Sequence, residues 1–332
     1  MTGRVVWDGR WIGRHGIGRH AQEVGSRIQG LVDILEPGRV RPTSPADPFY
    51  LRATLHLGSD DLFVSPGFNA SLPGAFRQLV TVHDLIHLKV DSESSFAKRA
   101  YYDRVVLPAI RSTKRVLTGS EFSRRELIKW TGLPPESVVA SGYGCSIAVA
   151  TRDELNCVSP ESIRRILFVG NPKPHKNFRL LLSALRHLSD DITLTTVGLP
   201  RAYVTKACIR EGVDSSRVSV FQGVSDETLR VLYATAACVA LPSTYEGFGL
   251  AALEGMAVGT PTAYVCDAVA EVVGPLGYRA ASATDGGAFA FALDDAISTG
   301  GAIRQELVKR AMMYSWDNSA AIVDRQIREM RA

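Results

Sequence analysis

The sequence predicts an α/β fold made of two Rossmann-like domains, each with a parallel sheet. Short apolar runs alternate with longer amphipathic segments through both halves of the chain, which is the pattern of strands joined by helices. Several of these runs end in a glycine turn, as strands of nucleotide-binding α/β domains do. The length of 332 residues, with 45% hydrophobic residues, is enough for two hydrophobic cores.

Composition excludes several classes of protein. The chain has no run of eighteen apolar residues and no apolar signal-peptide core near its start, so we expect a cytoplasmic protein. The five cysteines are scattered and form no C-x-x-C pair, which indicates neither a disulfide framework nor a zinc site. A net charge of +4 is too small to indicate nucleic-acid binding. Nothing in the sequence indicates an oligomeric state.

Positive charge is concentrated in one segment. Residues 97–131 contain nine basic and three acidic residues. Two interpretations stay open, namely solvated helix faces or a surface that contacts anionic lipid headgroups or a pyrophosphate-linked acceptor. In the second case the protein would be peripheral at the inner face of the plasma membrane.

The first half of the chain predicts a parallel sheet with covering helices. We expect strands at 4–8, 61–66, 77–84, 114–120 and 136–141. We expect a helix from the glycine loop at 13–20 to about residue 31, a loop region at 36–61, and helices at 96–111 and 120–130. Ser120 or Ser123 can cap the last of these helices.

The glycine loop at 13–20 has two interpretations. Gly16, Gly18 and Ala21 fit the G-x-G-x-x-A dinucleotide fingerprint, with Asp33 or Glu36 placed for a ribose. That fingerprint needs its first glycine directly after the strand, whereas seven residues separate Asp8 from Gly16. The longer loop therefore fits a nicotinamide site poorly.

His83 and Asp84 end the predicted strand at 77–84, where polar side chains of α/β proteins face the ligand crevice. A lone histidine is usually structural, so a structural role for His83 stays open. Asp84 either orients the His83 imidazole or caps the following segment.

A second α/β series follows a linker at 143–162. We expect strands at 165–170, 192–198, 217–223, 237–242 and 261–265. We expect helices at 178–188, 202–212 and 225–236, another from Leu250, and further helices at 285–298, 302–313 and 316–330. The first domain is thus placed at 1–160 and the second at 161–314.

Two loops of the second domain carry the candidate chemistry. Lys173 and Lys176 lie in the strand-to-helix loop at 171–177, where a cation can reach phosphate oxygens; a solvated lysine loop is the alternative. In the segment 243–262, a glycine turn precedes a helix at Leu250, so its first N–H groups form an anion site.

Two carboxylates, Glu246 and Glu254, flank this anion site. Carboxylates repel phosphate, so they are expected to accept hydrogen bonds from hydroxyl groups. A nucleotide sugar carries both phosphates and vicinal hydroxyls and would satisfy the arrangement. The alternative is a buried βα unit with solvated glutamates.

The pattern E-G-F-G-L-x-x-L-E with a following G-x-P resembles the signature of retaining glycosyltransferases of family 4. The resemblance implies the GT-B fold, in which two Rossmann-like domains face each other across a cleft. It extends to G-I-G-R at 16–19, V-H-D at 82–84 and the loop at 171–177, and so covers nearly the whole chain. It implies further that helix 315–332 packs back onto the first domain.

The resemblance also implies site residues. The catalytic set is Glu246, which contacts the transferred sugar, His83 and Lys176. The implied donor-binding set is Glu254 on the ribose, Lys173, Asn171, Gly16, Gly18, Gly198, Val224, Gly247, Phe248, Gly249 and Leu250. The acceptor-side set is Arg14, His15, Asp84 and Ser120. Asn171 stands where the family has an arginine, which leaves the diphosphate one cation short unless Lys173 replaces it.

The predicted function is sugar transfer, with retention, from a nucleoside-diphosphate sugar to a hydroxyl of a glycan or lipid-linked acceptor. The motifs look most like mannosyltransferases of bacterial surface polysaccharide or glycolipid synthesis, which makes GDP-mannose the expected donor. No D-x-D motif lies in a suitable place, so we expect no divalent metal and no cofactor. A nucleotide-sugar epimerase, an NAD-dependent oxidoreductase and an inactive nucleotide-sugar-binding module remain alternatives.

Overall fold

The computed structural model describes residues 3–13, 15–28, 33–36, 38–72, 74–157 and 164–331. The chain divides into two compact units. The first consists of Met1–Gly144 together with Tyr314–Ala332, and the second of Cys145–Met313. The sequence places the domain boundary at residue 160, within the segment that the second unit contains.

The first unit is built on a parallel sheet with the strand order β2-β1-β3-β4. Its continuation is a parallel pair, β5 and β6, joined to the end of β4 by a bridge between Thr81 and Leu117. The strands are β1 (Val5–Trp7), β2 (Asp33–Ile34), β3 (Leu62–Ser65), β4 (Arg77–Val80), β5 (Val116–Thr118) and β6 (Val138–Ala140). The chain leaves β1 for β2 on one side and then passes to β3 on the other, so strand order reverses between β1 and β3.

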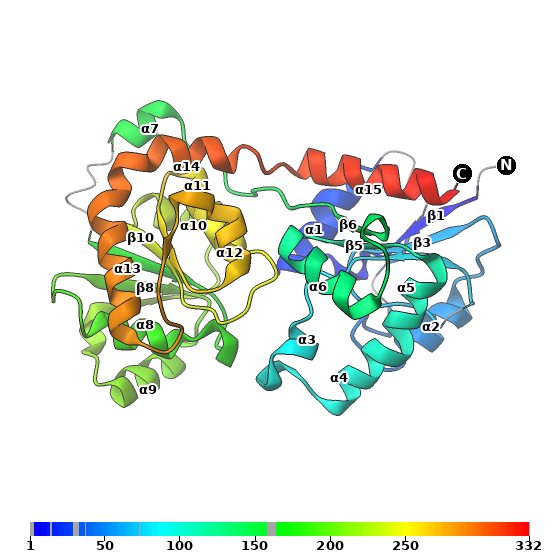
Figure 1. Ribbon diagram of the computed structural model, residues 1–332, viewed down its shortest axis with the longest axis horizontal. Coiled ribbons are helices and arrows are strands. Elements are labelled where there is room, and N and C mark those ends of the chain that lie inside the picture. The colour runs from blue at the N-terminus through cyan, green and yellow to red at the C-terminus, as the bar shows by residue number, and fades with distance from the viewer. Residues whose placement is uncertain are drawn as a thin grey trace. The chain divides into compact units, whose positions relative to one another are not determined.

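Helices cover this sheet. They are α1 (Gly16–Gly25), α2 (Asp47–Thr54), α3 (Ile86–Lys89), α4 (Phe96–Tyr101), α5 (Leu107–Thr113), α6 (Glu121–Thr131) and α15 (Trp316–Arg331). The C-terminal α15, red in Figure 1, lies beside α1 and belongs to the same unit. An aromatic contact of this region joins Trp316 to Tyr143, with ring centroids 6.1 Å apart.

The second unit contains a six-stranded parallel sheet with the order β12-β11-β10-β7-β8-β9. The strands are β7 (Arg165–Val169), β8 (Thr193–Val197), β9 (Val218–Phe221), β10 (Cys238–Leu241), β11 (Thr262–Tyr264) and β12 (Tyr278–Arg279). The chain runs from β7 outward to β9 and then returns to β10 on the other side of β7. Ligands of such sheets bind at this reversal point, beyond the carboxyl ends of the two strands.

The helices of the second unit pack on both faces of its sheet. They are α7 (Arg152–Cys157), α8 (Phe178–Leu185), α9 (Arg201–Glu211), α10 (Asp226–Ala234), α11 (Leu250–Ala257), α12 (Asp267–Val273), α13 (Gly286–Thr299) and α14 (Arg304–Ala311). In Figure 1, α13 lies along α8, and α11 packs with α14. The core between α8, α13 and the sheet contains Phe168, Leu181 and Phe289, all with no exposed surface.

The structure corrects three expectations about local structure. The region 36–61 contains the helix α2, and the linker at 143–162 contains α7. The helix expected at 96–111 has a π-helical turn, Tyr102–Val106, between α4 and α5. Pro108 follows this turn, and because proline has no N–H it cannot continue the regular hydrogen-bond ladder. Within the described ranges, no helix has the length and apolar composition needed to cross a membrane.

Candidate active site

The loop after β7 holds the two candidate phosphate-binding lysines. It forms a short 3₁₀ turn, Pro174–Lys176, and ends at Asn177, whose φ of 50° is in the left-handed region that asparagine tolerates better than most residues. The Asn177 amide donates to the carbonyl oxygen of Ala283 at 2.9 Å, which fixes the start of α8. Asn171 and Lys173 are exposed in this loop, and the Asn171 side chain accepts a hydrogen bond from the Lys173 N–H at 3.3 Å.

Lys176 and Glu246 form an ion pair. Their Nζ and Oε1 atoms are 2.6 Å apart, and the two side chains are 19% and 13% exposed. Burial acts to raise the pKa of Glu246, but the charge and hydrogen bond of Lys176 outweigh it, so the pKa lies below its ordinary value. Glu246 is therefore ionised at neutral pH.

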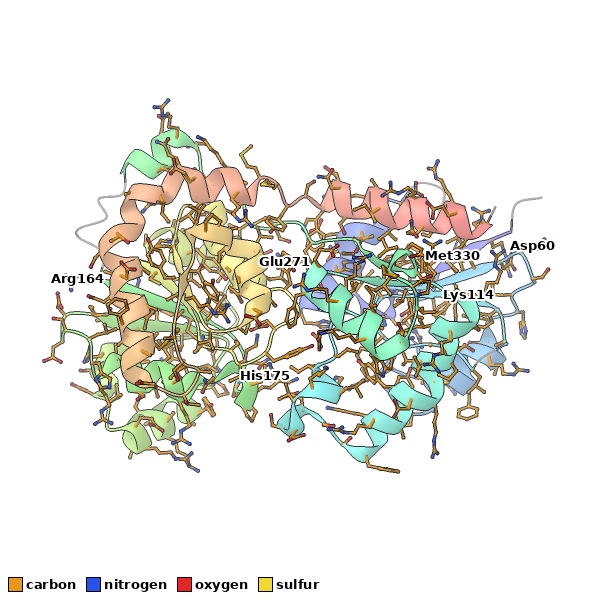
Figure 2. The ribbon with its side chains drawn as sticks, in the orientation of Figure 1. Asp60, Lys114, Arg164, His175, Glu271 and Met330 are labelled. Carbon is orange, nitrogen blue, oxygen red and sulfur yellow. The ribbon has the colours of Figure 1, made fainter. Side chains whose placement is uncertain are left out.

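The backbone joins the two loops that carry this pair. The N–H of Thr244 donates to the carbonyl oxygen of His175 at 2.9 Å. His175, labelled in Figure 2, is 5% exposed, and its charge also lowers the pKa of Glu246. The loops follow β7 and β10, which are neighbours in the sheet, so the contact lies at the reversal point of strand order.

The glycine turn at 247–249 starts α11 at Leu250. Gly249 has a φ of 109°, and a Cβ there would lie 3.0 Å from the Cγ2 atom of Val269, so both the backbone angle and the space require glycine. Gly249 is the N-cap of α11 and offers no side-chain acceptor to the first turn. Phe248 is buried at 5% exposure and anchors the turn, while the N-terminal end of α11 carries the positive end of the helix dipole.

Glu254 lies inside α11 and is half-buried. Its Oε2 atom accepts a hydrogen bond from the hydroxyl of Tyr233 at 2.7 Å. Tyr233 comes from α10 and has no exposed surface, so its hydroxyl is a fixed donor. The structure thus adds Tyr233 to the predicted site residues as a group that orients Glu254.

Two further predicted donor-binding positions lie at the ends of neighbouring strands. Gly198 follows β8 with a φ of 93°, and a Cβ there would lie 2.7 Å from the carbonyl oxygen of Gly170. This close approach to the end of β7 is enough to explain why residue 198 is glycine, so the glycine by itself does not indicate a ligand. Val224 is half-buried between β9 and Ser225, the N-cap of α10.

His83 of the first unit is 7% exposed, and both of its ring nitrogens have partners. Its Nε2–H donates to the carbonyl oxygen of Pro66 at 2.7 Å, so Nδ1, 2.5 Å from the Tyr143 hydroxyl, accepts from it. Burial lowers the pKa of His83 to about 4, and the charge of His15 contributes to the lowering. The imidazole is therefore neutral at pH 7, and its predicted contact with a sugar stays a prediction.

The glycine loop before α1 is held by its own residues. His15 is the N-cap of α1, and its Nδ1 atom accepts a hydrogen bond from the N–H of Gly18 at 3.0 Å. A Cβ at Gly18 would lie 2.5 Å from the carbonyl oxygen of Gly13, so close backbone packing requires this glycine. Gly16 is exposed at the first position of the helix, and Arg14 lies outside the described residues.

The remaining acceptor-side positions make capping contacts. The Asp84 carboxylate accepts from the N–H of Ile86 at 2.9 Å, at the start of α3. Ser120, 3% exposed, is the N-cap of α6 and accepts from the N–H of Ser123 at 3.0 Å. Of the two serines that the sequence offers as caps, Ser120 is the one used.

Within the second unit, the structure brings together several predicted catalytic and donor-binding residues: Asn171, Lys173 and Lys176 are in one loop, and residues 246–250 in the adjoining one. No group of three or more His, Cys, Asp or Glu side chains in the described part of the chain is arranged to hold a metal ion. Sequence reasoning missed Tyr233 and Tyr143, because each is indistinguishable from a core aromatic residue until its hydrogen-bond partner is known.

A family model described as glycosyl transferases group 1 matches residues 157–311, which is nearly all of the second unit. Residues 157–311 are a glycosyl transferases group 1 domain. This domain contains the Lys176–Glu246 pair and the glycine turn. For these residues the match confirms the glycosyltransferase family that the sequence motifs resemble.

The group 1 domain and the preceding unit also resemble known proteins. O-antigen chain mannosyltransferase B of Escherichia coli is 29% identical over 231 residues, which are 65% of this chain and 60% of that protein. A solved sucrose-phosphate synthase of Thermosynechococcus elongatus superposes with a TM-score of 0.71 at 16% identity, over 99% of both chains. Anabaena Alr3699/HepE, solved in complex with UDP-glucose, gives a TM-score of 0.70 at 15% identity, over 98% of both chains. These structural matches confirm the predicted GT-B fold.

Proposed function

We propose that the protein is a retaining hexosyltransferase that moves a sugar from a nucleoside diphosphate to a hydroxyl of a glycan or lipid-linked acceptor. The observation that carries the proposal is the Lys176–Glu246 pair beside the glycine turn at the reversal point of the second sheet. A cation and a helix N-terminus suit a diphosphate, and ionised carboxylates suit sugar and ribose hydroxyls.

The reaction breaks the bond between the anomeric carbon and the diphosphate oxygen, whose electron pair leaves with the diphosphate. The acceptor oxygen would form the new bond on the same face of the sugar, and its proton would pass to the departing diphosphate oxygen. Lys176 and the N-terminal end of α11 would stabilise the charge that develops on the leaving group, without a metal ion. Lys173, exposed in the same loop, is the candidate to replace the arginine absent at Asn171.

Glu246 and Glu254 would hold the donor by its hydroxyls. Glu246 is ionised and can exchange its hydrogen bond from Lys176 for hydrogen bonds from the sugar. Glu254, oriented by the hydroxyl of Tyr233, would accept hydrogen bonds from the ribose hydroxyls. In this assignment Glu246 positions the sugar and is not a nucleophile.

GDP-mannose is the proposed donor, because relatives of this chain carry the names O-antigen chain mannosyltransferase B and O-antigen chain mannosyltransferase RfbU. The same names support a place in surface-polysaccharide synthesis. The basic segment at 97–131 supports a peripheral contact with an anionic membrane surface. Liposome co-sedimentation tests that contact, and equal binding to neutral and anionic vesicles would contradict it.

The test of the function is incubation of the protein with GDP-mannose, UDP-glucose or NAD, with and without acceptor and with and without EDTA. We expect mannose transfer that requires the acceptor and continues in the presence of EDTA. NMR of the product should show that the anomeric configuration is retained. Conversion of the donor sugar without acceptor would indicate an epimerase, and reduction of NAD an oxidoreductase. Donor binding without turnover with every acceptor would indicate an inactive binding module.

A further inference from the structure

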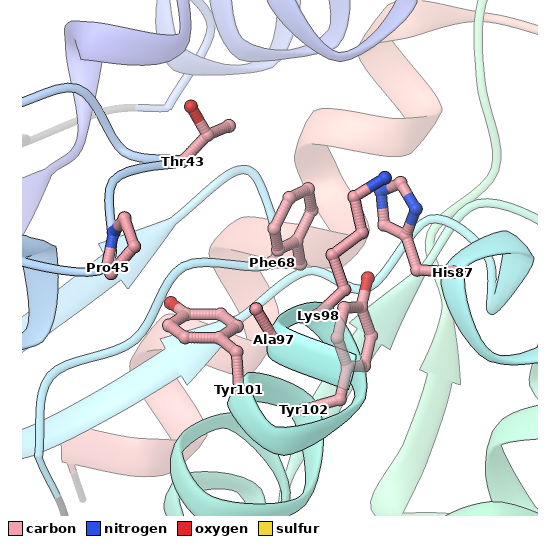
Figure 3. A pocket seen from close by; sticks show the side chains of 8 residues that line it. All are labelled: Thr43, Pro45, Phe68, His87, Ala97, Lys98, Tyr101 and Tyr102. Atoms are coloured by element: carbon pink, nitrogen blue, oxygen red, sulfur yellow. The ribbon is translucent and has the colours of Figure 1, made fainter. Parts of the chain in front are cut away.

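The first unit contains a pocket of about 370 Å³ that none of the predicted site residues lines. Figure 3 shows its eight side chains, with the rings of Phe68, Tyr101 and Tyr102 close together. The lining residues are Thr43, Pro45, Phe68, His87, Ala97, Lys98, Tyr101 and Tyr102. The volume is at the lower end of the range of small-molecule sites, roughly 300 to 1,000 Å³.

The pocket lies where the fold places ligands. Thr43 and Phe68 come from the segments after β2 and β3, and His87 from the segment after β4. Parallel strands bring the segments that follow them to one edge of the sheet, which is the ligand-binding edge of open α/β sheets. Trp11, which follows β1, supports the Phe68 ring at a centroid distance of 5.3 Å.

The helix that forms one wall has a distorted backbone at the pocket. Tyr102 begins the π-helical turn, and its ring stacks with Phe68 at a centroid distance of 5.7 Å and an interplanar angle of 26°. Single π turns inside helices are frequent at functional sites.

The pocket walls are mainly apolar, and three polar groups that line the pocket already have hydrogen-bond partners in the backbone. The Tyr101 hydroxyl accepts from the N–H of Ala70 at 3.2 Å. The Lys98 ammonium donates to the carbonyl oxygen of Glu93 at 2.7 Å, and Nδ1 of His87 lies 3.1 Å from the same oxygen. A sugar ring would lose hydrogen bonds with water on entering an apolar pocket, which costs free energy. Burial of a hydrocarbon chain in the same pocket is favourable.

One cation lines this apolar pocket. Lys98 is exposed, and its ammonium has two further hydrogens beyond the one directed to Glu93. Phe96, which precedes the lining residue Ala97, is 83% exposed and adds an exposed apolar side chain to α4. The combination suits an amphiphile with an apolar chain and an anionic head.

We propose that this pocket binds the hydrocarbon chain of an acceptor, with Lys98 holding a phosphate attached to that chain. The proposal rests on the proposed function and narrows its acceptor from a glycan or lipid-linked molecule to a lipid-linked one. At about 30 Å³ for a group the size of a water molecule or methylene, the pocket accommodates roughly twelve such groups.

Titration calorimetry with octyl, decyl and dodecyl phosphate, each below its micelle concentration, tests the chain. We expect affinity to increase up to about fourfold for each added methylene, until the pocket is full near twelve carbons. Inorganic phosphate should not compete at the same concentration. Equal affinity for the three chain lengths would overturn the proposal.

Two variants of the same helical segment locate the binding. Ala97→Trp fills the pocket from an exposed position and should lower dodecyl phosphate affinity at least tenfold. Asp103→Trp adds the same ring at an exposed position outside the pocket without removing a basic residue, and should not lower affinity. Equal effects of the two variants would contradict a pocket site. Lys98→Glu should weaken dodecyl phosphate but not dodecyl maltoside.

Farnesyl phosphate distinguishes the two sources of such a chain. Tighter binding of farnesyl phosphate than of dodecyl phosphate assigns a branched prenyl chain, and the reverse order assigns a straight acyl-type chain; either result supports the pocket. GDP binding, measured on the same protein preparation, tests the proposed function separately. Absence of GDP binding would count against sugar transfer, whereas absence of chain-length dependence would count against the pocket alone.

Discussion

The Lys176 ammonium and the Glu246 carboxylate, assigned to phosphate and to sugar hydroxyls respectively, are hydrogen-bonded to each other at 2.6 Å. The pair neutralises both charges at a place where both side chains are largely buried. A diphosphate that binds Lys176 must therefore compete with Glu246 for the ammonium. In the proposed function, donor binding would therefore release Glu246 from Lys176, so that its carboxylate can accept hydrogen bonds from the sugar hydroxyls.

Replacement of Lys176 tests its role in leaving-group stabilisation. Lys176→Ala should lower kcat by roughly 10² to 10³, the usual loss for one preorganised donor in a transition state. Lys206→Ala, at an exposed lysine of α9 in the same unit, is the control and should retain wild-type turnover. Product formation is measured by chromatography with GDP-mannose as donor. Wild-type turnover in Lys176→Ala would remove this residue from the mechanism.

His83 should make stability depend on pH in a defined window. Its folded-state pKa of about 4 lies below the unfolded value of about 6.5, so the unfolded chain takes up the proton first as pH falls. The contribution to stability is complete above pH 6.5 and is lost towards pH 4, by roughly 3 kcal/mol in total at 1.36 kcal/mol per pKa unit.

An NMR titration of the histidine ring nitrogens checks this expectation directly. The His83 signals should stay those of a neutral ring with a proton on Nε2 at pH 5, because Pro66 accepts from that nitrogen. His83→Gln should show a smaller loss of unfolding free energy between pH 6.5 and 4 than the wild-type protein. Protonation of His83 near pH 6.5 would show that the buried arrangement does not exist in solution.

The alternation of strands and helices was predictable because buried parallel strands are short apolar runs with clear ends. The helix α2 was not predictable, because residues 36–61 have no periodic pattern. Its first residue, Asp47, is buried in an ion pair with Arg10, with a nitrogen–oxygen distance of 2.6 Å. Such a long-range ion pair cannot be read from local sequence. The π turn at Tyr102–Val106 was also not predictable, because residues 96–111 keep a helical pattern of apolar residues through the turn.

The candidate site shows the same limit. Lys176 and Glu246 were each predicted from their own loops, but their contact depends on β7 and β10 being neighbours, which the sequence alone does not reveal. Tyr233 was missed because it reads as an apolar position of an amphipathic helix. The Tyr233 hydroxyl can act on the site only because α10 packs against α11, which brings the hydroxyl oxygen within 2.7 Å of the Oε2 atom of Glu254.

Removal of the Tyr233 hydroxyl tests whether it orients Glu254 for the ribose. Tyr233→Phe should raise the KM for the donor about tenfold or more with little change in kcat, since a hydrogen bond to a charged group contributes about 1.5 kcal/mol or more. A donor with a deoxyribose should lose less affinity in the variant than in the wild-type protein. Tyr203→Phe, on α9, is the matched control. If replacing the ribose by deoxyribose lowered donor affinity equally in the wild-type protein and in Tyr233→Phe, Tyr233 would have no role in ribose binding.

The glycine turn before α11 should tolerate no side chain. Gly249→Ala forces a Cβ onto a backbone with φ of 109° and within 3.0 Å of Val269, so we expect a loss of about 2 to 3 kcal/mol in unfolding free energy and a weaker anion site. Gly212→Ala is the control, because its φ of 65° lies in the left-handed region and its Cβ would meet no atom within 4 Å. That variant should lose only about 1 kcal/mol, the cost of the left-handed conformation. Urea unfolding and GDP titration of both variants measure the two effects; equal destabilisation would mean that the contact with Val269 relaxes without cost.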